Sequence, residues 1–379
     1  MMDHWNIKVV QRLAYVVGSH PRYHGTFIQT VLLLIALGSI ATTTSLVIAL
    51  FIYEENLKLL DFTEGMQALM FCLHILIKLL WFCKQHDKII DLLKVSKQFW
   101  NVDELIEEDE KKQILKYLWY LKTIMGYFLA FAVPTSLMII LRPLLQQGTL
   151  PFKSYIPENK YYYYPIVVVE QYTMVVIYCG CISFDAFFGS TIVLMAIQFK
   201  MLNKEIQRVL ASTPLNEKDQ LLVRKKLKRC IEHHNFLLNF VKKINNTISL
   251  GLLLYIGVII LSNCVEFFAI VSGQPINEFV KSLFYIISLT NQFVAYYIVP
   301  GQLLTAEAEK MEKVAFESQW YRNLKFNKPI INMISCMGQR KVHVHAFNVI
   351  NLSFASGLQA YKTIISYYMF LRTMNRDRS

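Results

Sequence analysis

Apolar runs long enough to cross a bilayer recur along the whole chain, and no other feature limits its fold as strongly. A helix that crosses the ~30 Å hydrocarbon core needs ~20 mostly apolar residues. Only 17% of the 379 residues are charged, against ~25% in soluble proteins. The sequence therefore predicts an all-α, seven-transmembrane helical bundle that forms a single domain over residues 1–379. The predicted spans lie at about 27–53, 66–83, 121–141, 166–199, 248–272, 279–299 and 343–371.

Lysine and arginine are distributed unevenly between the two sides of these spans. The N-terminus and the second, fourth and sixth connections, counted with Lys122 near the start of the third span, hold 29 of them, whereas the opposite side, counted with Lys281 near the start of the sixth span, holds 8. Cytoplasmic loops of membrane proteins carry the excess of positive charge. We therefore expect an intracellular N-terminus and an extracellular C-terminus, although Arg372, Arg376 and Arg378 argue mildly against it. The net charge of +12 is then a consequence of topology and does not indicate nucleic-acid binding.

The three inner connections, 84–120, 200–247 and 300–342, are long, and in the first two apolar residues recur at helical spacing. This pattern predicts helices that extend the spans into the cytoplasm and pack together there. Lys225, Lys226, Lys228 and Arg229 form a basic cluster in the second of these connections. Such a cluster could bind lipid headgroups, but a solvated helix face is the preferred interpretation.

Residue patterns that carry catalysis or hold metals are hard to find in this chain. His233-His234 and His343-x-His345 diverge by 100–200° on a helix, so neither pair can easily face one ion. No phosphate-binding glycine loop or nucleophile motif is present, and the seven cysteines lie in spans or on the inner side. We therefore expect no enzyme activity, no metal, no cofactor and no external disulfide framework.

Five ionisable residues lie within or near the spans, where charge is costly and normally paired. Asp185 is the deepest, and we expect it to be a hydrogen-bonded anchor between helices rather than a direct ligand contact. Lys362 could discourage cations if it faces a pore, or it could extend to the interface or pair with a carboxylate. The full set is Lys78, Glu170, Asp185, Glu266 and Lys362.

The last predicted span has one polar face. Within about 140° of this face, at 100° per residue, lie Asn348, Asn351, Ser356, Gln359, Lys362, Thr363, Ser366, Phe370 and Thr373. Lipid cannot satisfy such groups, so the stripe predicts contact either with a water-filled path or with polar groups of neighbouring helices.

The outer halves of the second to sixth spans supply a mostly apolar and aromatic set of side chains. Such a lining, with a few hydroxyls and one imidazole, suits a small uncharged hydrophobic ligand. The same residue types also occur in any bundle core or lipid-facing surface. The predicted ligand contacts are Met70, Phe71, His74, Thr135, Leu137, Tyr178, Ile182 and Phe188.

Short motifs near the end of the chain occur in an order and spacing that are together specific. They are Pro300-Gly301-Gln302-Leu303-Leu304-Thr305, Glu307, Glu309-Lys310, Ala315-Phe316-Glu317-Ser318-Gln319-Trp320-Tyr321, Leu324-Lys325, Lys328-Pro329, Asn351-Leu352-Ser353-Phe354 and Ser366-Tyr367-Tyr368-Met369-Phe370-Leu371. On these motifs, and on its length and seven spans, the whole chain resembles the insect odorant receptors, in their ligand-tuning class. Gustatory receptors are similar too, but their terminal motif is degraded here, since Thr373-Met374 stands where Gln-Phe would be expected.

The resemblance implies a subunit of a ligand-gated, nonselective cation channel that forms a heterotetramer with a co-receptor in the plasma membrane of olfactory neuron dendrites. It implies that small volatile odorants bind in the outer half and that the inner segments form a cytoplasmic anchor. It also implies that the last span lines the pore through Gln359, Thr363 and Ser366, with a gate at Phe370 and Met374. The alternatives are a gustatory-type receptor channel and a seven-helix receptor that does not conduct; a transporter would need an inverted repeat, which the sequence lacks.

Overall fold

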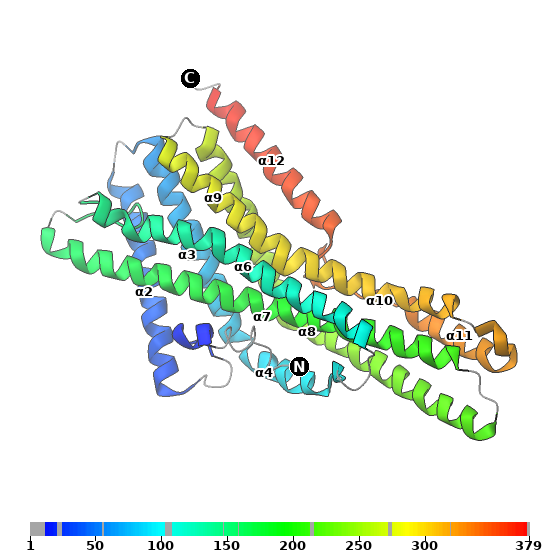
Figure 1. Ribbon diagram of the computed structural model, residues 1–379. Helices are drawn as coiled ribbons and strands as arrows, with labels where there is room; N and C mark the ends of the chain where they lie inside the picture. Colours follow the sequence, from blue (N-terminus) through cyan, green and yellow to red (C-terminus); the bar gives the residue numbers. More distant parts are fainter. Residues whose placement is uncertain are drawn as a thin grey trace.

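The protein is described by a computed structural model, which covers residues 12–20, 25–54, 57–102, 108–146, 148–157, 159–212, 216–271, 275–318 and 320–376. These residues are mostly helical, and the long helices run alongside one another (Figure 1). The elements are α2 (Phe27–Tyr53), α3 (Leu59–Lys84), α4 (His86–Val95), η1 (Ser96–Gln98), α6 (Glu108–Leu145), η2 (Lys160–Tyr162), α7 (Tyr163–Ala211), α8 (Glu217–Val271), α9 (Ile276–Phe293), η3 (Val294–Ile298), α10 (Val299–Glu317), η4 (Trp320–Asn323), α11 (Leu324–Gly338), β1 (His345–Ala346), β2 (Ile350–Asn351) and α12 (Phe354–Arg376).

Five described helical segments are long and apolar enough to cross a membrane: Phe27–Tyr53, Leu60–Lys84, Tyr163–Ala211, Glu217–Ile270 and Phe279–Glu317. The predicted third span lies on α6, where the longest apolar segment with all its side chains described is Ser136–Leu145. The predicted seventh span lies on α12, whose hydropathy is lowered by the polar stripe.

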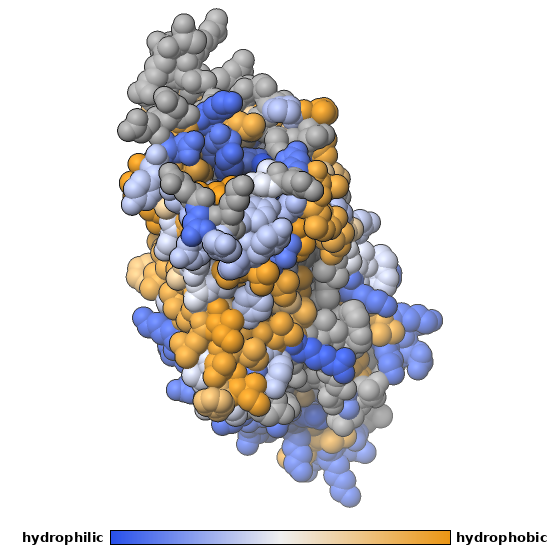
Figure 2. Space-filling view, turned by 90° about the vertical axis from the view of Figure 1, so that its left-hand side faces the viewer, coloured by the Kyte–Doolittle hydropathy of each residue, from blue (hydrophilic) through white to orange (hydrophobic). Residues whose placement is uncertain are grey.

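Apolar side chains also cover much of the outer surface. On α2, Phe27 is 83% exposed and Leu34 is 62% exposed. Figure 2 shows hydrophobic side chains gathered over a broad area of one face, with hydrophilic ones mainly toward its ends. A soluble monomer seldom exposes so much contiguous apolar surface, whereas lipid tails cover it at no cost.

Helix α7 is the centre of the bundle, and every residue from Gly180 to Phe199 is buried. With 49 and 55 residues, α7 and α8 are longer than any bilayer core requires at 1.5 Å per residue. Their continuation beyond the spans makes the predicted inner segment helical over residues 200–211 and 217–247. Buried side chains in the C-terminal part of α7 join one core cluster with those of α10, α11 and α4, so the core continues past the predicted spans.

The helix that starts at α9 does not end at Phe293 but continues through a π-helical turn, η3, into α10. A π-turn holds one residue more than an α-turn and is common at functional sites. On α7, Gly189 faces this turn, and a Cβ added to it would lie 3.0 Å from the carbonyl oxygen of Tyr296. The absence of a side chain at Gly189 therefore lets α7 approach the π-turn closely.

The last helix begins later than predicted. Residues 343–353 do not extend the span but form a small hairpin, in which β1 pairs antiparallel with β2. Phe347 and Asn348 occupy its turn with φ of 48° and 57°, and asparagine tolerates this left-handed conformation well. The buried Val342, Val344 and Ala346 alternate with more exposed residues, which is the two-residue period of a strand. Asn348 and Asn351 therefore do not belong to the polar stripe.

Candidate ligand site and exposed last helix

An aromatic cluster joins α3, α8 and α9. Phe71 of α3 packs against Tyr285 of α9, with ring centroids 4.5 Å apart. One turn along the same helix, His74 contacts Tyr255 of α8 at 4.8 Å. These residues meet because positions 71, 74 and 78 share one face of α3 at helical spacing.

This cluster contains buried polar atoms that lack partners. Among the described residues, neither His74 Nε2 nor the Tyr255 hydroxyl has a hydrogen-bond partner, and the two side chains are 4% and 2% exposed. A buried polar group without a partner costs ~1–3 kcal/mol. A ligand that brings a hydroxyl, carbonyl or ring nitrogen to this point would recover part of that cost, so the pair is suited to orient a small molecule.

A buried ion pair lies one turn below His74. The Lys78 Nζ atom is 2.7 Å from Asp185 Oδ1 and 2.8 Å from Oδ2, and both side chains are 1% exposed. Gln292 of α9 and Tyr297 of the π-turn also donate hydrogen bonds to the Asp185 carboxylate. The Lys78 ammonium lies 4.1 Å from the centroid of the Tyr255 ring. Asp185 therefore anchors α3, α7 and the α9–α10 helix together, as predicted, and its main partner is Lys78.

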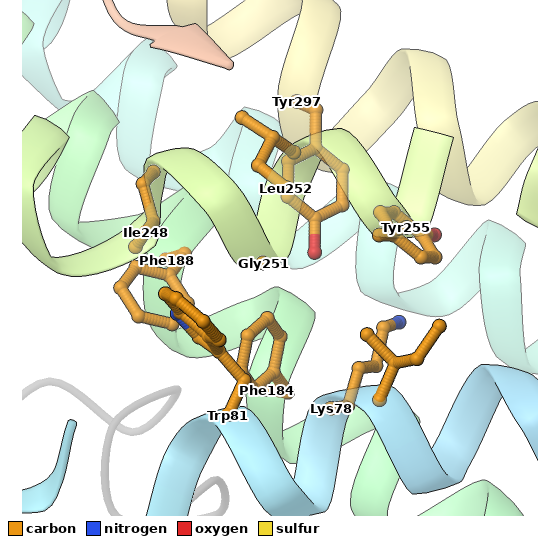
Figure 3. A pocket seen from close by; sticks show the side chains of 10 residues that line it. Lys78, Trp81, Phe184, Phe188, Ile248, Gly251, Leu252, Tyr255 and Tyr297 are labelled. Carbon is orange, nitrogen blue, oxygen red and sulfur yellow. The ribbon is translucent and has the colours of Figure 1, made fainter. Parts of the chain in front are cut away.

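A small cavity lies beside Lys78, one member of this ion pair (Figure 3). It is lined by Lys78, Trp81, Phe184, Phe188, Tyr255 and Tyr297, among others, and has a volume of about 10 Å³. That volume holds about one water molecule. An odorant-sized molecule would therefore need neighbouring side chains to move apart.

The connection before α7 folds over the Phe71 end of the cluster. The buried Glu170 carboxylate accepts a hydrogen bond from the Phe152 backbone N–H at 3.0 Å and from the Ser154 hydroxyl at 2.6 Å. The Phe152 ring then lies 6.4 Å from that of Phe71. Lys153 pairs with Asp61 of α3 at 2.8 Å. This connection therefore closes the aromatic cluster on that side.

The predicted ligand residues are only partly brought together. Phe71 and His74 belong to the aromatic cluster, and Phe188 lines the small cavity beside it. Tyr178 and Ile182 lie on α7, where Ile182 is buried and Tyr178 is half-buried, and Met70 is half-buried on α3. Leu137 is 49% exposed on α6 and stands apart from the buried set. The side chain of Thr135 lies outside the described part of the structure.

Sequence reasoning missed Tyr255 and Tyr285, which complete the cluster, as well as Gln67. The Gln67 side-chain amide donates to Glu266 Oε2 at 2.7 Å and to Ser282 at 3.4 Å, which joins α3 to α8 and α9. A sequence signal was available, because tyrosine and glutamine within apolar spans carry polar groups that need a partner. It did not show which face of each helix they occupy.

The last helix packs against the bundle on only one side. α12 contacts α8 and the π-turn, and it stands away from the rest in Figure 1. Its predicted pore residues Gln359, Thr363, Ser366 and Phe370 line one open groove of about 380 Å³ together with Lys362 and Tyr367. The side chain of Met374 lies outside the described part of the structure. The structure thus gathers the polar stripe on a surface that no described helix covers.

The adjacent histidines His233 and His234 are buried and pack against aromatic side chains. His233 stacks on Trp100 with ring centroids 3.9 Å apart, and the Arg229 guanidinium lies over the Trp100 ring, 5.2 Å from its centroid. This stretch of α8 precedes the predicted span. Burial, reinforced by Arg229, lowers the pKa of His233 to about 3, so the imidazole is neutral at physiological pH. Within the described residues, no group of three His, Cys, Asp or Glu side chains could hold a metal ion.

These features agree with the comparisons to known proteins. The sequence model described as 7tm Odorant receptor matches residues 58–367. The chain therefore belongs to the odorant receptor family, a family of receptors rather than enzymes, and it is a membrane protein. The resemblance drawn from the terminal motifs is confirmed.

Two relatives come from Drosophila melanogaster. Odorant receptor 13a is 27% identical over 61% of this chain and 59% of its own length, and odorant receptor 85b is 20% identical over 59% and 57%. The matches thus span less than two thirds of either relative.

The fold is similar to that of the insect olfactory receptor OR5 from Machilis hrabei. The structure of OR5 with eugenol has a TM-score of 0.81 and 12% identity over 98% of both chains. The structure of OR5 without eugenol has a TM-score of 0.77 and 12% identity over 96% of this chain and 97% of the other. The predicted all-α seven-helix class is confirmed, whereas the orientation of the termini stays a prediction.

Proposed function

We propose that this receptor is the odorant-binding subunit of a ligand-gated, nonselective cation channel, assembled as a heterotetramer with an odorant co-receptor in the plasma membrane of olfactory neuron dendrites. The observation that carries the proposal is the exposed polar stripe of α12. An amphipathic helix in a membrane protein needs a polar environment for such a stripe. A central water path shared with other subunits supplies that environment.

The odorant site in this proposal is the aromatic cluster of Phe71, His74, Tyr255 and Tyr285. Its rings suit flat or compact hydrophobic molecules, and His74 Nε2 and the Tyr255 hydroxyl offer one polar contact. The fold neighbour solved with eugenol makes small aromatic volatiles a reasonable first class to test. A ligand opens the channel only to the extent that it binds the open state more tightly than the closed state.

The test is whole-cell current in cells that express this chain with or without an odorant co-receptor. The cells are challenged with eugenol, 2-methoxyphenol, methyl benzoate, isoamyl acetate and 2-methylpyrazine. We expect an evoked cation current only when both subunits are present. We also expect Phe370→Ala to change the ion preference or block of that current, because a large aromatic side chain at the gate restricts the conducting path.

The alternative is a receptor that signals through a cytoplasmic partner without conducting. An N-terminal tag that antibody reaches on intact cells would favour it and would contradict the intracellular N-terminus. Absence of current from all five volatiles, with both subunits shown at the cell surface, would also reject the channel. Phe370→Tyr, which retains an aromatic ring, is the control for the gate substitution.

The pocket gives a second prediction, which compares 2-methoxyphenol with its hydroxyl-free analogue methoxybenzene. In Tyr255→Phe, the response to 2-methoxyphenol is expected to weaken about two- to tenfold relative to that of methoxybenzene, because one buried hydrogen bond contributes ~0.5–1.5 kcal/mol. His74→Phe is expected to act in the same direction. The measurement is the ratio of half-maximal concentrations for the two compounds. Equal losses of response to both compounds would show that these side chains only support packing. The control is Tyr321→Phe, because Tyr321 is exposed and lies in the predicted cytoplasmic segment 300–342.

A further inference from the structure

Three faces can be distinguished on α12. The first packs on the bundle: Ile364 is 1% exposed, Tyr368 contacts Phe267 of α8 at 6.1 Å, and a Cβ added to Gly357 would touch Ile298 at 3.4 Å. The second is apolar and exposed, formed by Phe354, Leu358, Ile365 and Met369. The third is the polar groove. At 100° per residue these faces follow one another around the helix without overlap.

The polar groove carries a positive charge. Lys362 is exposed and lines the groove together with Gln359, Thr363 and Ser366. It lies eight residues after the first residue of α12, or ~12 Å along the axis, so it belongs to the middle part of the helix rather than to an end.

No carboxylate of its own helix can neutralise this charge, because residues 354–376 contain neither aspartate nor glutamate. On α8, the helix that packs against α12, the carboxylate within the outer part is Glu266. That side chain is buried and accepts a hydrogen bond from Gln67 on the far side of α8, toward α3. Among the described residues, the Lys362 ammonium in the groove therefore has no ion-pair partner on α12, and Glu266 does not pair with it either.

We propose that Lys362 is a selectivity-determining residue of the channel, which disfavours divalent cations in the water path. This inference rests on the proposed function, since it requires that the groove lines a conducting pore. Repulsion between fixed and mobile charges scales with the charge of the ion. At a 4 Å approach in water, the ammonium disfavours a divalent cation about fivefold more than a monovalent one, and salt screening reduces this figure.

The expected outcome is a change in relative permeability. Reversal potentials are measured in the heteromeric channel, opened by whichever of the five volatiles gives the largest current, with Na⁺ or Ca²⁺ as the external cation. Lys362→Gln is expected to raise the permeability of Ca²⁺ relative to Na⁺ about three- to fivefold, and Lys362→Glu is expected to raise it further. Lys362→Arg keeps the charge and is expected to leave the ratio unchanged.

Lys225→Gln is the matched control for loss of one positive charge, because Lys225 is exposed near the start of α8. Figure 1 shows that this end of α8 lies far from α12. A Lys362→Gln channel that carries normal odour-evoked current with an unchanged permeability ratio would overturn the inference and leave the proposed function standing. Absence of current in the unmodified channel would instead reject the proposed function, and the inference with it.

A second measurement does not require channel opening. Lys362→Cys and Ile364→Cys are each assembled with the co-receptor and exposed to a charged maleimide in permeabilised cells, with labelling of the native cysteines subtracted. We expect labelling at position 362 and none at the buried position 364. Protection of position 362 from the maleimide would show that Lys362 does not face water in the assembled channel and would overturn the inference.

Discussion

Asp185→Ala is expected to abolish most surface expression of the receptor and to lower the unfolding midpoint of the solubilised complex more than any other single change considered. The substitution leaves the Lys78 ammonium, which is 1% exposed, without the Asp185 carboxylate that pairs with it. Breaking a buried ion pair in this way costs ~3–5 kcal/mol. It also leaves the Gln292 amide and the Tyr297 hydroxyl without their acceptor. The measurement is thermal unfolding followed by size-exclusion chromatography.

A paired substitution separates the charge from the packing. Lys78→Met combined with Asp185→Leu removes both charges, and replacement of a buried pair by apolar side chains is often neutral or stabilising. The double variant is therefore expected to regain much of the lost stability. Asp91→Ala is the control, since its pair with Lys243 is about half exposed and is worth at most ~1 kcal/mol. If Asp185→Ala were as stable as the unmodified receptor, the anchoring role of this carboxylate would be wrong.

Gly301→Ala is expected to give the second largest loss, because α10 and the hairpin approach each other without room for a methyl group. A Cβ at this position would lie 2.5 Å from Leu352 Cβ and 2.6 Å from the Leu352 carbonyl oxygen. Since one of these atoms belongs to the backbone, the segment that leads into α12 must shift. Overpacking of this kind costs ~1–3 kcal/mol. We expect a lower unfolding midpoint together with weaker odour-evoked current per receptor at the surface.

The matched control is Gly257→Ala on α8, where an added Cβ meets nothing within 4 Å. Removal of a helical glycine there is expected to be neutral or slightly stabilising. The two alanine variants are compared in the same unfolding assay and at equal surface density. Equal midpoints for both would show that the contact between Gly301 and Leu352 does not hold the hairpin in place.

Most of the helical framework could be predicted from the sequence, because apolar runs of ~20 residues have few other solutions. The beginning of the last helix was predicted wrongly at 343. The alternation of Val342, Val344 and Ala346 with polar residues indicates a strand, but it lies next to a long apolar span and was absorbed into it. Short alternating segments are hard to separate from neighbouring helices by periodicity alone.

The candidate site was harder to predict than the helices. Asp185 was identified as a buried anchor, yet its partner Lys78 is 107 residues away, and no local pattern links the two. Phe71 and His74 were found because they are an aromatic and an imidazole side chain in the predicted outer half of the second span. Tyr255 and Tyr285 were missed and Leu137 was included, because the face that each long helix turns inward depends on tertiary packing.

The π-turn at Val294–Ile298 inserts one residue more than an α-helical turn would hold into the middle of the continuous α9–α10 helix. Conversion of such a turn to α-helical hydrogen bonding would rotate the following helix by ~100° and shift it by ~1.5 Å. The segment contains both Tyr297, which donates to Asp185, and Ile298, which lies against Gly357 of α12. A single sliding step there would thus change the surroundings of the ion pair and the support of the last helix at once, without breaking either neighbouring helix.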